Sequence, residues 1–540
     1  MQADNAKGAN KFMKGDIPEN EILTKEKAAE AKSAQKAAKS KTAFSVARAN
    51  EYVEKNASAV GKKYAPSYHV VPPVGWMNDP NGFCYALNKY RLFFQFHPYS
   101  VVWGPMHWGH YDTDDFVKWE RKSVAIAPDK DYDADGCFSG SSIEKDGKQF
   151  LFYTAVKGNV QEQAAAVSSD GENFVKTGVI ISGEKLPEDC SRADFRDPYV
   201  FLKDGTYCML CGSQAKDKDA QVLLFCSKDL QNWEFKAVLR KDSKPSFGIY
   251  ECPCMFSFGD KDVLVTSPQG YVADGWRFEN ACSSIYTVGK LDLKNGKFEK
   301  YGEDEIDGGF NFYAAQTLVS PDGRIIMIAW IHPWCIQTPG NEGIKGAMIL
   351  PRELRLENGA LYQSPVREIE KYRKNGVRTE NVSVGENTVI NGVSGKKIEI
   401  ICDFSLENAE SAGVEFFKGE NTRASICVKK DGTVIFDRSE TGVDYMRDAN
   451  ETNALKRTVK VAVNGGKVRL RIFLDVSVCE IFVNDGERVM TGYVYTRENG
   501  DGVSFFARGG KAELVSLEKY DIETGNQAIN SRFAVTAKVR

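Results

Sequence analysis

Histidine is scarce in this chain, with five histidines among 540 residues, so a metal site would have few nitrogen ligands to use. No stretch reaches the roughly 18 consecutive apolar residues that a transmembrane helix needs. The N-terminal stretch MQADNAKGANKFMKGD also lacks the apolar core of a signal peptide. We therefore expect a cytoplasmic protein with no membrane partner, no metal and no cofactor.

Neither sign of charge dominates, because 71 basic and 74 acidic residues leave a formal net charge of -3. This balance does not indicate a nucleic-acid partner. The thirteen cysteines form no dense, regular framework, which favours a reducing compartment. The close pairs Cys208/Cys211 and Cys252/Cys254 are interpreted as buried strand thiols, because no second pair completes a metal site. His107 and His110 are likewise interpreted as packed side chains rather than ligands.

The N-terminal part of the chain is rich in Ala, Lys and Glu. Residues 22 to 57 contain neither Gly nor Pro, and this composition favours helix. We predict one or two exposed helices within an N-terminal extension, residues 1–65. The extension is either a solvated segment or one that docks on the main body or on a partner.

From about residue 66 the sequence changes to short β-rich runs such as RLFFQFHP and RIIMIAWIHP, broken by Gly, Asp and Asn. A weak repeat places a turn and an aromatic residue after Asp115, Asp170, Asp229 and Asp292, which lie 55, 59 and 63 residues apart. That period suits units of about four short strands. We predict a five-bladed β-propeller over residues 66–355.

The pattern changes again after the propeller. Following a linker over 356–374, residues 375–525 alternate apolar and polar positions in runs such as KIEIICDFSL and VRLRIFLDVSVCEIFVND. Strands of this number and spacing indicate an antiparallel β-sandwich, followed by a tail over 526–540. The predicted fold class is therefore all-β, a propeller followed by a sandwich, with the helical extension in front.

Three carboxylates stand out because each lies beside Pro among aromatic or Cys residues. They are Asp79 in WMNDPNG, Asp197 in DFRDPYVF and Glu251 in GIYECPCMF. We predict that NDPNG forms a tight turn that directs Asp79 along the propeller axis. Since a propeller gathers the first strand of each blade around its axis, we expect the three acids to meet there.

These motifs resemble those of glycoside hydrolase family 32, the invertase and fructanase family. WMNDPNG, FQFHP, WGH, FSGS, FRDP and EC occur in the family's order, and DGGFNFYAAQ, LPREL and LDVSVCEIFVNDG match further on. The resemblance covers about residues 66 to 520. It implies a five-bladed propeller with a β-sandwich, in agreement with the repeat.

The resemblance implies that Asp79 is the nucleophile, Glu251 the general acid/base and Asp197 a transition-state stabiliser. In a retaining mechanism the carboxyl groups of Asp79 and Glu251 should lie about 5 to 5.5 Å apart. Asn78 and nearby backbone amides are expected to keep Asp79 ionised. Tyr250, Cys252 and Pro253 are expected to give Glu251 an apolar environment that keeps it protonated.

Substrate contacts carry over from the family with less detail. The residues implied are Trp76, Met77, Asn78, Gln95, Trp103, Phe138, Ser139 and Arg196. Two positions depart from the family pattern: Asn311 stands where Asp is usual, and Val476 where Arg is common.

The expected activity is that of a retaining β-fructofuranosidase acting on sucrose or sucrose 6-phosphate. A phosphate would need a basic cluster at the rim, for which Arg277 and Lys157 are candidates. An exo-acting hydrolase of short fructo-oligosaccharides, of inulin or levan type, is an alternative. An inverting arabinanase-like propeller glycosidase and a fructan-binding protein without turnover are more distant ones. The sequence leaves a homo-oligomer open.

Overall fold

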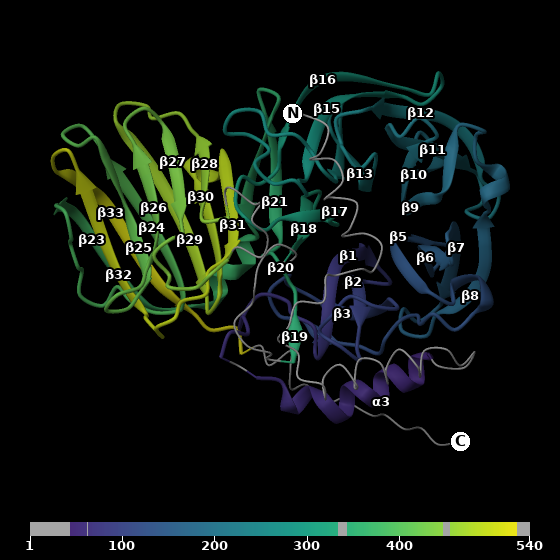
Figure 1. Ribbon diagram of the computed structural model, residues 1–540, viewed down its shortest axis with the longest axis horizontal. Helices are drawn as coiled ribbons and strands as arrows, with labels where there is room; N and C mark the ends of the chain where they lie inside the picture. Colours follow the sequence, from purple (N-terminus) through teal and green to yellow (C-terminus); the bar gives the residue numbers. More distant parts are fainter. Residues whose placement is uncertain (1–43, 62, 333–342, 446–453, 526–540) are drawn as a thin grey trace, which may run out of the picture.

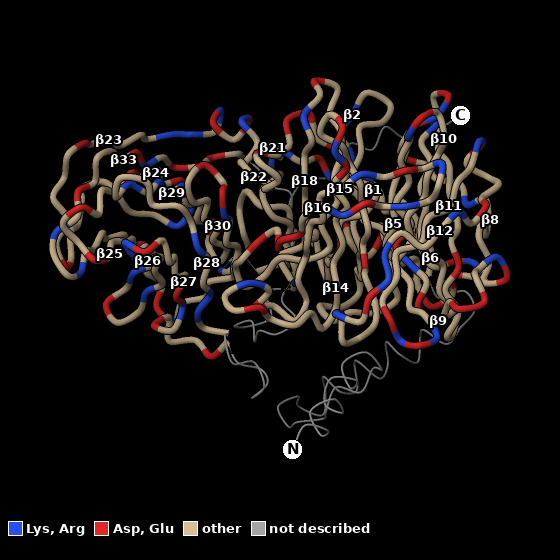
Figure 2. The backbone as a smooth tube through the Cα atoms, turned by 90° about the horizontal axis from the view of Figure 1, so that it is seen from above, with Lys and Arg blue, Asp and Glu red and all other residues tan. Residues whose placement is uncertain are grey.

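The computed structural model describes residues 44–61, 63–332, 343–445 and 454–525. Two β domains lie side by side in Figure 1, the propeller in purple to teal and the sandwich in green to yellow. Much of the expected N-terminal extension, residues 1–43, and the expected tail, 526–540, lie outside the described residues. Figure 2 shows Lys and Arg interspersed with Asp and Glu along both domains.

Five sheets form the blades of a five-bladed propeller within the described residues, as predicted. In each blade the first strand in sequence is innermost, and later strands pair outwards from it. The first blade contains β1 (Gly75–Ala86), β2 (Lys89–His97), β3 (His107–Thr113) and β4 (Glu120–Arg121), and the second contains β5 (Gly136–Lys145), β6 (Lys148–Lys157), β7 (Val160–Ser168) and β8 (Val175–Ile181). The third contains β9 (Cys190–Lys203), β10 (Thr206–Ala215), β11 (Ala220–Ser227) and β12 (Glu234–Asp242), and the fourth contains β13 (Tyr250–Phe258), β14 (Lys261–Pro268), β15 (Ile285–Asp292) and β16 (Lys297–Glu305). The fifth contains β17 (Tyr313–Val319), β18 (Ile325–Ile331), β20 (Ala347–Met348), β21 (Arg352–Glu357) and β22 (Ala360–Pro365).

The weak sequence repeat marks the turn before the fourth strand in each of the first four blades. One carboxylate oxygen of Asp115, Asp170 or Asp229 accepts hydrogen bonds from the backbone N–H groups two and three residues later. Asp292 accepts from the backbone N–H of Asn295. An Asp side chain that bonds its own following backbone stabilises such a tight turn. The repeated strand–turn–strand corner is therefore confirmed.

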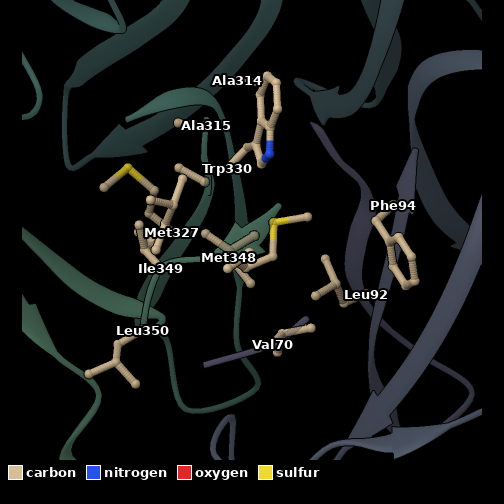
Figure 3. Packing of buried hydrophobic residues seen from close by; sticks show 14 of the residues in the cluster. Val70, Leu92, Phe94, Ala314, Ala315, Met327, Trp330, Met348, Ile349 and Leu350 are labelled. Carbon is tan, nitrogen blue, oxygen red and sulfur yellow. The ribbon is translucent and has the colours of Figure 1, made fainter. Parts of the chain in front are cut away.

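The ring closes where the fifth blade meets the first. β19 (Ile344–Lys345) pairs in parallel with β1, with Ile344 opposite Gly75. The backbone N–H of Met348 donates to the carbonyl of Val70 at 2.8 Å. Figure 3 shows the core at this closure, which contains the buried side chains of Val70, Leu92, Phe94, Met327, Trp330 and Met348.

The sandwich consists of two antiparallel sheets, and its hydrophobic cluster is largely separate from that of the propeller. One sheet contains, in spatial order, β23 (Arg373–Val384), β33 (Ala512–Ile522), β24 (Lys397–Ser405), β29 (Lys467–Asp475), β30 (Val478–Val483) and β31 (Arg488–Tyr493). The other contains β28 (Lys456–Lys460), β27 (Thr433–Asp437), β26 (Ala424–Lys429), β25 (Ser411–Lys418) and β32 (Gly502–Arg508). Short 3-10 turns occur at η1 (Ala57–Ala59), η2 (Asp131–Asp133), η3 (Gly183–Lys185), η4 (Arg367–Tyr372) and η5 (Asn484–Gly486).

The boundary between the domains lies later than the expected position at residue 355. β21 and β22 form a hairpin of the fifth blade within the stretch expected to begin the linker. Asn358 and Gly359 turn this hairpin with positive φ angles of 51° and 84°, as Asn-Gly turns do. Only η4 separates Pro365 from the first sandwich strand, so 366–372 is the connection.

The N-terminal helix docks on the first blade instead of standing free in solvent. α3 (Val46–Asn56) begins after Ser45, whose hydroxyl caps the backbone N–H of Arg48. The helix buries Ala49 and Val53, and Asn50 accepts a hydrogen bond from the backbone N–H of Val124 at 2.9 Å. In its described part the extension is therefore an element of the main body, which agrees with the docking alternative and not with a solvated segment.

A buried network of charged residues joins the two domains and explains three of the sequence motifs. Arg352 of LPREL donates to Asp307 of DGGFNF at 3.0 Å and to Glu480 of the sandwich at 2.5 Å. His69 bridges Glu480 and Asp475, with both ring nitrogens 2.9 Å from a carboxylate oxygen. All five side chains are fully buried. These motifs therefore form the interface between the domains.

The network sets the charge of His69. Burial by itself lowers the pKa of this imidazole, but hydrogen bonds and charges from Asp475 and Glu480 raise it to about 9. Burial opposes ionisation of Asp475 and Glu480, yet His69 and Arg352 hold the pKa of the Glu480 carboxyl below its usual range, and His69 does the same for Asp475. The imidazolium and both carboxylates are therefore charged together near neutral pH.

Asn311, one of the two departures from the family pattern, also lies between the domains. Its amide nitrogen donates to the carbonyl of His332 at 2.7 Å, and its amide oxygen accepts from the backbone N–H of Tyr493 at 3.0 Å. A carboxylate in its place has no hydrogen to donate to His332. Asn311 therefore supports the domain interface with both ends of its amide.

Val476, the other departure, has a strained backbone. It is the first residue of the two-residue turn between β29 and β30, with a φ of 60°. This angle is unfavourable for a β-branched residue and suits glycine. We expect Val476→Gly to raise the free energy of unfolding of the sandwich by about 1 kcal/mol. The midpoint of urea unfolding measures this gain in stability. Ser477→Gly is the contrast, because it removes the hydrogen bond from the Ser477 hydroxyl to the carbonyl of Tyr64 and should lower the midpoint. An unfolding midpoint lowered by Val476→Gly would contradict the assignment of strain.

Candidate active site

A β-bulge recurs in the inner strand of all five blades. At each bulge the inner strand has one more residue than the strand that pairs with it. The bulges lie between Met77 and Pro80, Phe138 and Gly140, Arg196 and Tyr199, Glu251 and Cys254, and Tyr313 and Gln316. A bulge bends a strand and redirects its side chains. The residues at or beside these five bulges include the three predicted carboxylates.

The NDPNG stretch is not a turn. It lies within the twelve-residue strand β1, which has one register shift between Met77 and Pro80 and a second between Asn81 and Cys84. Gly82 has a φ of 53° in the second irregular region, where an added Cβ would meet the ring of Phe93 at 2.8 Å. Pro and Gly therefore serve bulges in a strand, and the predicted tight turn is wrong.

Asp79 is half-buried and held by side chains. Ser139 donates to Oδ2 at 2.5 Å, and Asn78 donates to Oδ1 at 3.2 Å. Trp76 donates in turn to the amide oxygen of Asn78 at 2.8 Å, which fixes the orientation of that amide. The expected Asn78 contact is confirmed. The hydrogen bonds described for this carboxylate all come from side chains. We expected backbone amides to donate to it, but the second donor is the hydroxyl of Ser139.

Asp197 lies beside Asp79. Its backbone has a φ of 63° at the bulge of β9, and its N–H donates to the hydroxyl of Thr154 at 2.9 Å. Its Oδ2 accepts from the backbone N–H of Cys252 at 2.9 Å. The Cys252 thiol is 3.6 Å from Asp79 Oδ2 and 3.7 Å from Asp197 Oδ2, so one sulfur contacts both carboxylates.

Glu251 is held by polar donors from three other strand or loop positions. Arg196 Nε donates to Oε1 at 2.9 Å, while Gln269 and Tyr313 donate to Oε2 at 2.6 Å and 2.7 Å. The expected apolar environment is therefore wrong. Its neighbour Tyr250 extends elsewhere, to Asp242, because successive side chains of a strand point to opposite faces.

The carboxylates influence one another's protonation. Burial raises the pKa of Asp79, the hydrogen bond from Ser139 opposes this, and the negative charge of Glu251 raises it further. Burial and then the charge of Glu251 raise the pKa of Asp197 to about 7, against the opposing effect of Arg196. Like charges brought together in a buried site produce such shifts, and carboxylates perturbed in this way are typical of catalytic sites.

The remaining predicted substrate residues divide into two groups. Trp76, Met77, Gln95 and Ser139 are almost completely buried. Met77 belongs to the hydrophobic core, and Gln95 donates to the carbonyl of Cys137 at 3.0 Å. In contrast, Trp103 is 44% exposed and packs edge-on against Phe138, with ring centroids 5.6 Å apart. The structure therefore brings these two aromatic residues together at the surface and places Met77 in the core.

The two basic candidates for a phosphate site lie on different blades. Lys157, at the end of β6, is 2.5 Å from Asp131. Arg277, in the connection between β14 and β15, is paired with Asp274 and lies over the ring of Phe278. The two basic side chains therefore form no joint cluster, and each pairs with an acid close to it in its own part of the propeller.

Sequence reasoning missed four residues that support the three predicted acids: Thr154 accepts from the backbone N–H of Asp197, Gln161 accepts from Arg196, and Gln269 and Tyr313 donate to Glu251. Gln161 accepts from Arg196 at 3.2 Å and from the backbone N–H of Phe195 at 3.0 Å. Three of the four lie on or just after second and third strands, where nothing in the local pattern marks them. Tyr313 alone had a signal, because it lies in the matched motif DGGFNFYAAQ.

Cysteine and histidine have the packing roles that were predicted. Cys208, Cys211, Cys252 and Cys254 are buried free thiols in strands. His107 and His110 are buried in β3. Across the described ranges, no group of three or more His, Cys, Asp or Glu side chains is placed to hold a metal ion.

The two domains correspond to the two halves of a known family model. Residues 69–365 match the model described as "Glycosyl hydrolases family 32 N-terminal domain", and residues 368–521 match "Glycosyl hydrolases family 32 C terminal". The chain belongs to glycoside hydrolase family 32. It is therefore a glycoside hydrolase, and the propeller is the family's N-terminal domain.

Three known proteins are similar to this chain over most of its length. A sucrose-6-phosphate hydrolase of Escherichia coli is 35% identical over 473 residues, which cover 84% of this chain and 94% of that protein. A levanase of Bacillus subtilis is 31% identical over 86% of this chain and 71% of its own length. The solved structure of sucrose-6-phosphate hydrolase from Lactobacillus gasseri superimposes with a TM-score of 0.79 at 27% identity, covering 88% of this chain and 96% of that one.

The helical content of the described segments is small. None of their helices combines the length and the apolar composition that crossing a membrane requires.

Proposed function

We propose that this family 32 hydrolase is a retaining β-fructofuranosidase that releases the terminal β-D-fructofuranosyl unit of sucrose or sucrose 6-phosphate. Asp79 is the nucleophile, Glu251 the general acid/base and Asp197 the residue that stabilises the transition state. Arg196, Asn78 and Ser139 hold these carboxylates, and Trp103 with Phe138 offers an apolar wall to the sugar.

The reaction follows the double displacement of retaining glycosidases. In the first step Asp79 forms a bond to the anomeric carbon of the fructosyl unit. The glycosidic bond breaks, and its oxygen takes the proton of Glu251. In the second step Glu251 takes a proton from water, the water oxygen bonds to the anomeric carbon, and Asp79 leaves. Asp197 faces the positive charge that develops on the ring in both steps.

The observation that carries the proposal is the convergence of three carboxylates from three separate blades on one point. Cys252 contacts both Asp79 and Asp197, and Arg196 adjoins Asp197 while donating to Glu251. Three acids in contact through shared neighbours are costly for stability, because each raises the energy of its ionised neighbours. A nucleophile, an acid and a charge stabiliser need this arrangement.

Sucrose and its 6-phosphate are favoured by the relatives named sucrose-6-phosphate hydrolase, which match almost their whole length. Short fructo-oligosaccharides are the second candidate. They are favoured by the relative named levanase and by the exposure of Trp103, since a longer chain needs aromatic surface beyond the first sugar. The match to family 32 over both domains argues against the arabinanase-like alternative.

Steady-state kinetics with sucrose, sucrose 6-phosphate and 1-kestose would test the proposal. We expect the highest kcat/KM with sucrose or its phosphate, and glucose or its phosphate as the second product. A higher kcat/KM with 1-kestose would select the fructo-oligosaccharide alternative. No fructose release from any of the three would support the fructan-binding protein without turnover.

The hydrogen bond from Ser139 to Asp79 predicts a change in pH dependence. This bond lowers the pKa of the carboxyl, so Ser139→Ala should raise that pKa and move the acid limb of kcat/KM to higher pH. A charge-assisted hydrogen bond of this kind corresponds to a displacement of roughly one pH unit. The pH profile with sucrose, compared between the wild type and the variant, measures it. An acid limb that stays in place would show that Asp79 is not the group that titrates there.

We also propose a cytoplasmic location. The Cys252 thiol contacts two catalytic carboxylates, and a reducing compartment keeps such a thiol in its reduced form. Cell fractionation of the native host tests this, and activity confined to the medium would contradict it.

A further inference from the structure

Gln269 extends from the strand next to Glu251 and reaches the same carboxylate. Glu251 is opposite Ser267 in the β13–β14 pair, and Gln269 lies two residues beyond Ser267. Residues two apart on a strand share a face, and a long side chain reaches its diagonal neighbour across the pair. The Gln269 amide accordingly donates to Glu251 Oε2 at 2.6 Å.

The backbone holds Gln269 in this position from two sides. Its N–H donates to the carbonyl of Ile249, and its carbonyl accepts from the N–H of Phe247, both at 3.4 Å. An isolated bridge with Cys282 closes the connection that begins there. The side chain thus starts from a fixed point just outside the end of β14.

The two oxygens of Glu251 have different neighbours. Oε2 accepts from Gln269 and Tyr313, which occupy both of its lone pairs, while Oε1 accepts only from Arg196 among the hydrogen bonds described. Tyr313 has an alternative acceptor, the carbonyl of Ser267 at 2.8 Å, and a hydroxyl has one hydrogen to donate. The Gln269 amide is therefore the more constant donor to Oε2.

We propose that Gln269 is a positioning residue for the general acid. Its amide holds Oε2 as the unprotonated oxygen of Glu251, so that the proton for the leaving group is carried on Oε1 in a fixed orientation. The inference rests on the proposed function, because it needs Glu251 to be the acid. It predicts that loss of the amide harms proton delivery and leaves attack by Asp79 intact.

A comparison of leaving groups tests the inference. Sucrose has an oxygen leaving group that must be protonated, whereas β-D-fructofuranosyl fluoride loses fluoride without needing an acid. We expect Gln269→Met to lower kcat/KM for sucrose about tenfold or more, part of the 10²- to 10⁴-fold that general acid catalysis supplies. The kcat/KM for the fluoride should change by less than about threefold, because its first step does not use the acid. Gln269→Ala should show the same discrimination.

The matched control is Gln214→Met. Gln214 is a buried glutamine that donates to the carbonyl of Phe247 at 3.0 Å, in the same segment, and makes no contact with Glu251 among the hydrogen bonds described. The Gln214→Met variant should either slow the hydrolysis of both substrates to the same extent or leave both unchanged. The inference would be overturned if Gln214→Met slowed sucrose more than the fluoride, or if Gln269→Met slowed both substrates equally. Either result would show that the variants act by disturbing the packing of the loop and not by disturbing proton delivery.

Glu251→Gln separates this inference from the proposed function. That variant should discriminate between the two substrates more strongly than Gln269→Met. If Glu251→Gln discriminates and neither Gln269 variant does, only the role of Gln269 fails. If Glu251→Gln slows both substrates equally, the assignment of Glu251 as the acid fails.

Discussion

The Asp79→Asn variant is expected to lose turnover of sucrose almost completely, by roughly 10⁴- to 10⁶-fold in kcat, as other hydrolases do without a catalytic group. An amide of the same size fits the site and keeps an oxygen to accept from Ser139. It does not form the ester to the anomeric carbon that the mechanism needs. Initial rates of fructose release at saturating sucrose measure the effect.

The control for Asp79→Asn is Asp114→Asn. Asp114 is an exposed acid of the same blade that pairs with Lys89 at 2.6 Å, so its loss should leave kcat unchanged. Circular dichroism of both variants should match the wild type. If Asp79→Asn retained more than a tenth of the wild-type kcat, Asp79 would not be the nucleophile.

The Glu480→Gln variant should have the largest effect on stability. It leaves Arg352 and His69 buried with one carboxylate fewer, and breaking a buried ion pair from one side costs about 3 to 5 kcal/mol. The exposed pair lost in Asp114→Asn should cost less than about 1 kcal/mol. Urea unfolding of the three proteins compares these costs. Equal midpoints for Glu480→Gln and the wild type would show that the network does not hold the domains together.

The same network predicts how stability depends on pH. His69 has a pKa of about 9 in the folded chain against an ordinary 6.5, so its contribution is complete below pH 6.5 and disappears as pH rises through 9. The lowered pKa values of Asp475 and Glu480 act on the acid side, where stability is lost as these carboxyls become protonated. Melting temperatures should therefore fall as the pH rises from about 6.5 to about 9, and His69→Gln should remove most of that fall. A flat melting temperature from pH 7 to 10 would contradict this.

The architecture could be predicted from the sequence because its signals are local. Asp115, Asp170 and Asp229 mark the same corner in successive blades, and each corner depends on hydrogen bonds within four residues. The domain boundary was misplaced although Asn358 and Gly359 carried a hairpin signal. The N-terminal helix was predicted from composition, but its docking depends on Asn50 and Val53 meeting the first blade, which no local pattern reveals.

The meeting of Asp79, Asp197 and Glu251 could be predicted from the sequence because unusual neighbours mark each of them. Pro80 and Gly82 were correctly associated with Asp79, although they serve bulges in a strand rather than a turn. The environment of Glu251 could not be read from its flanks, because adjacent side chains of a strand face opposite ways. Its donors Arg196, Gln269 and Tyr313 come from other parts of the chain and meet it only after the blades have formed.

The most direct test of the mechanism is mass spectrometry of the enzyme quenched with acid during turnover of sucrose. The Glu251→Gln variant with β-D-fructofuranosyl fluoride should accumulate the intermediate, because its formation no longer needs an acid while its hydrolysis still needs a base. We expect an added mass of one fructosyl group on the peptide that contains Asp79. Fructose release without any adduct, or an adduct on another residue, would contradict it.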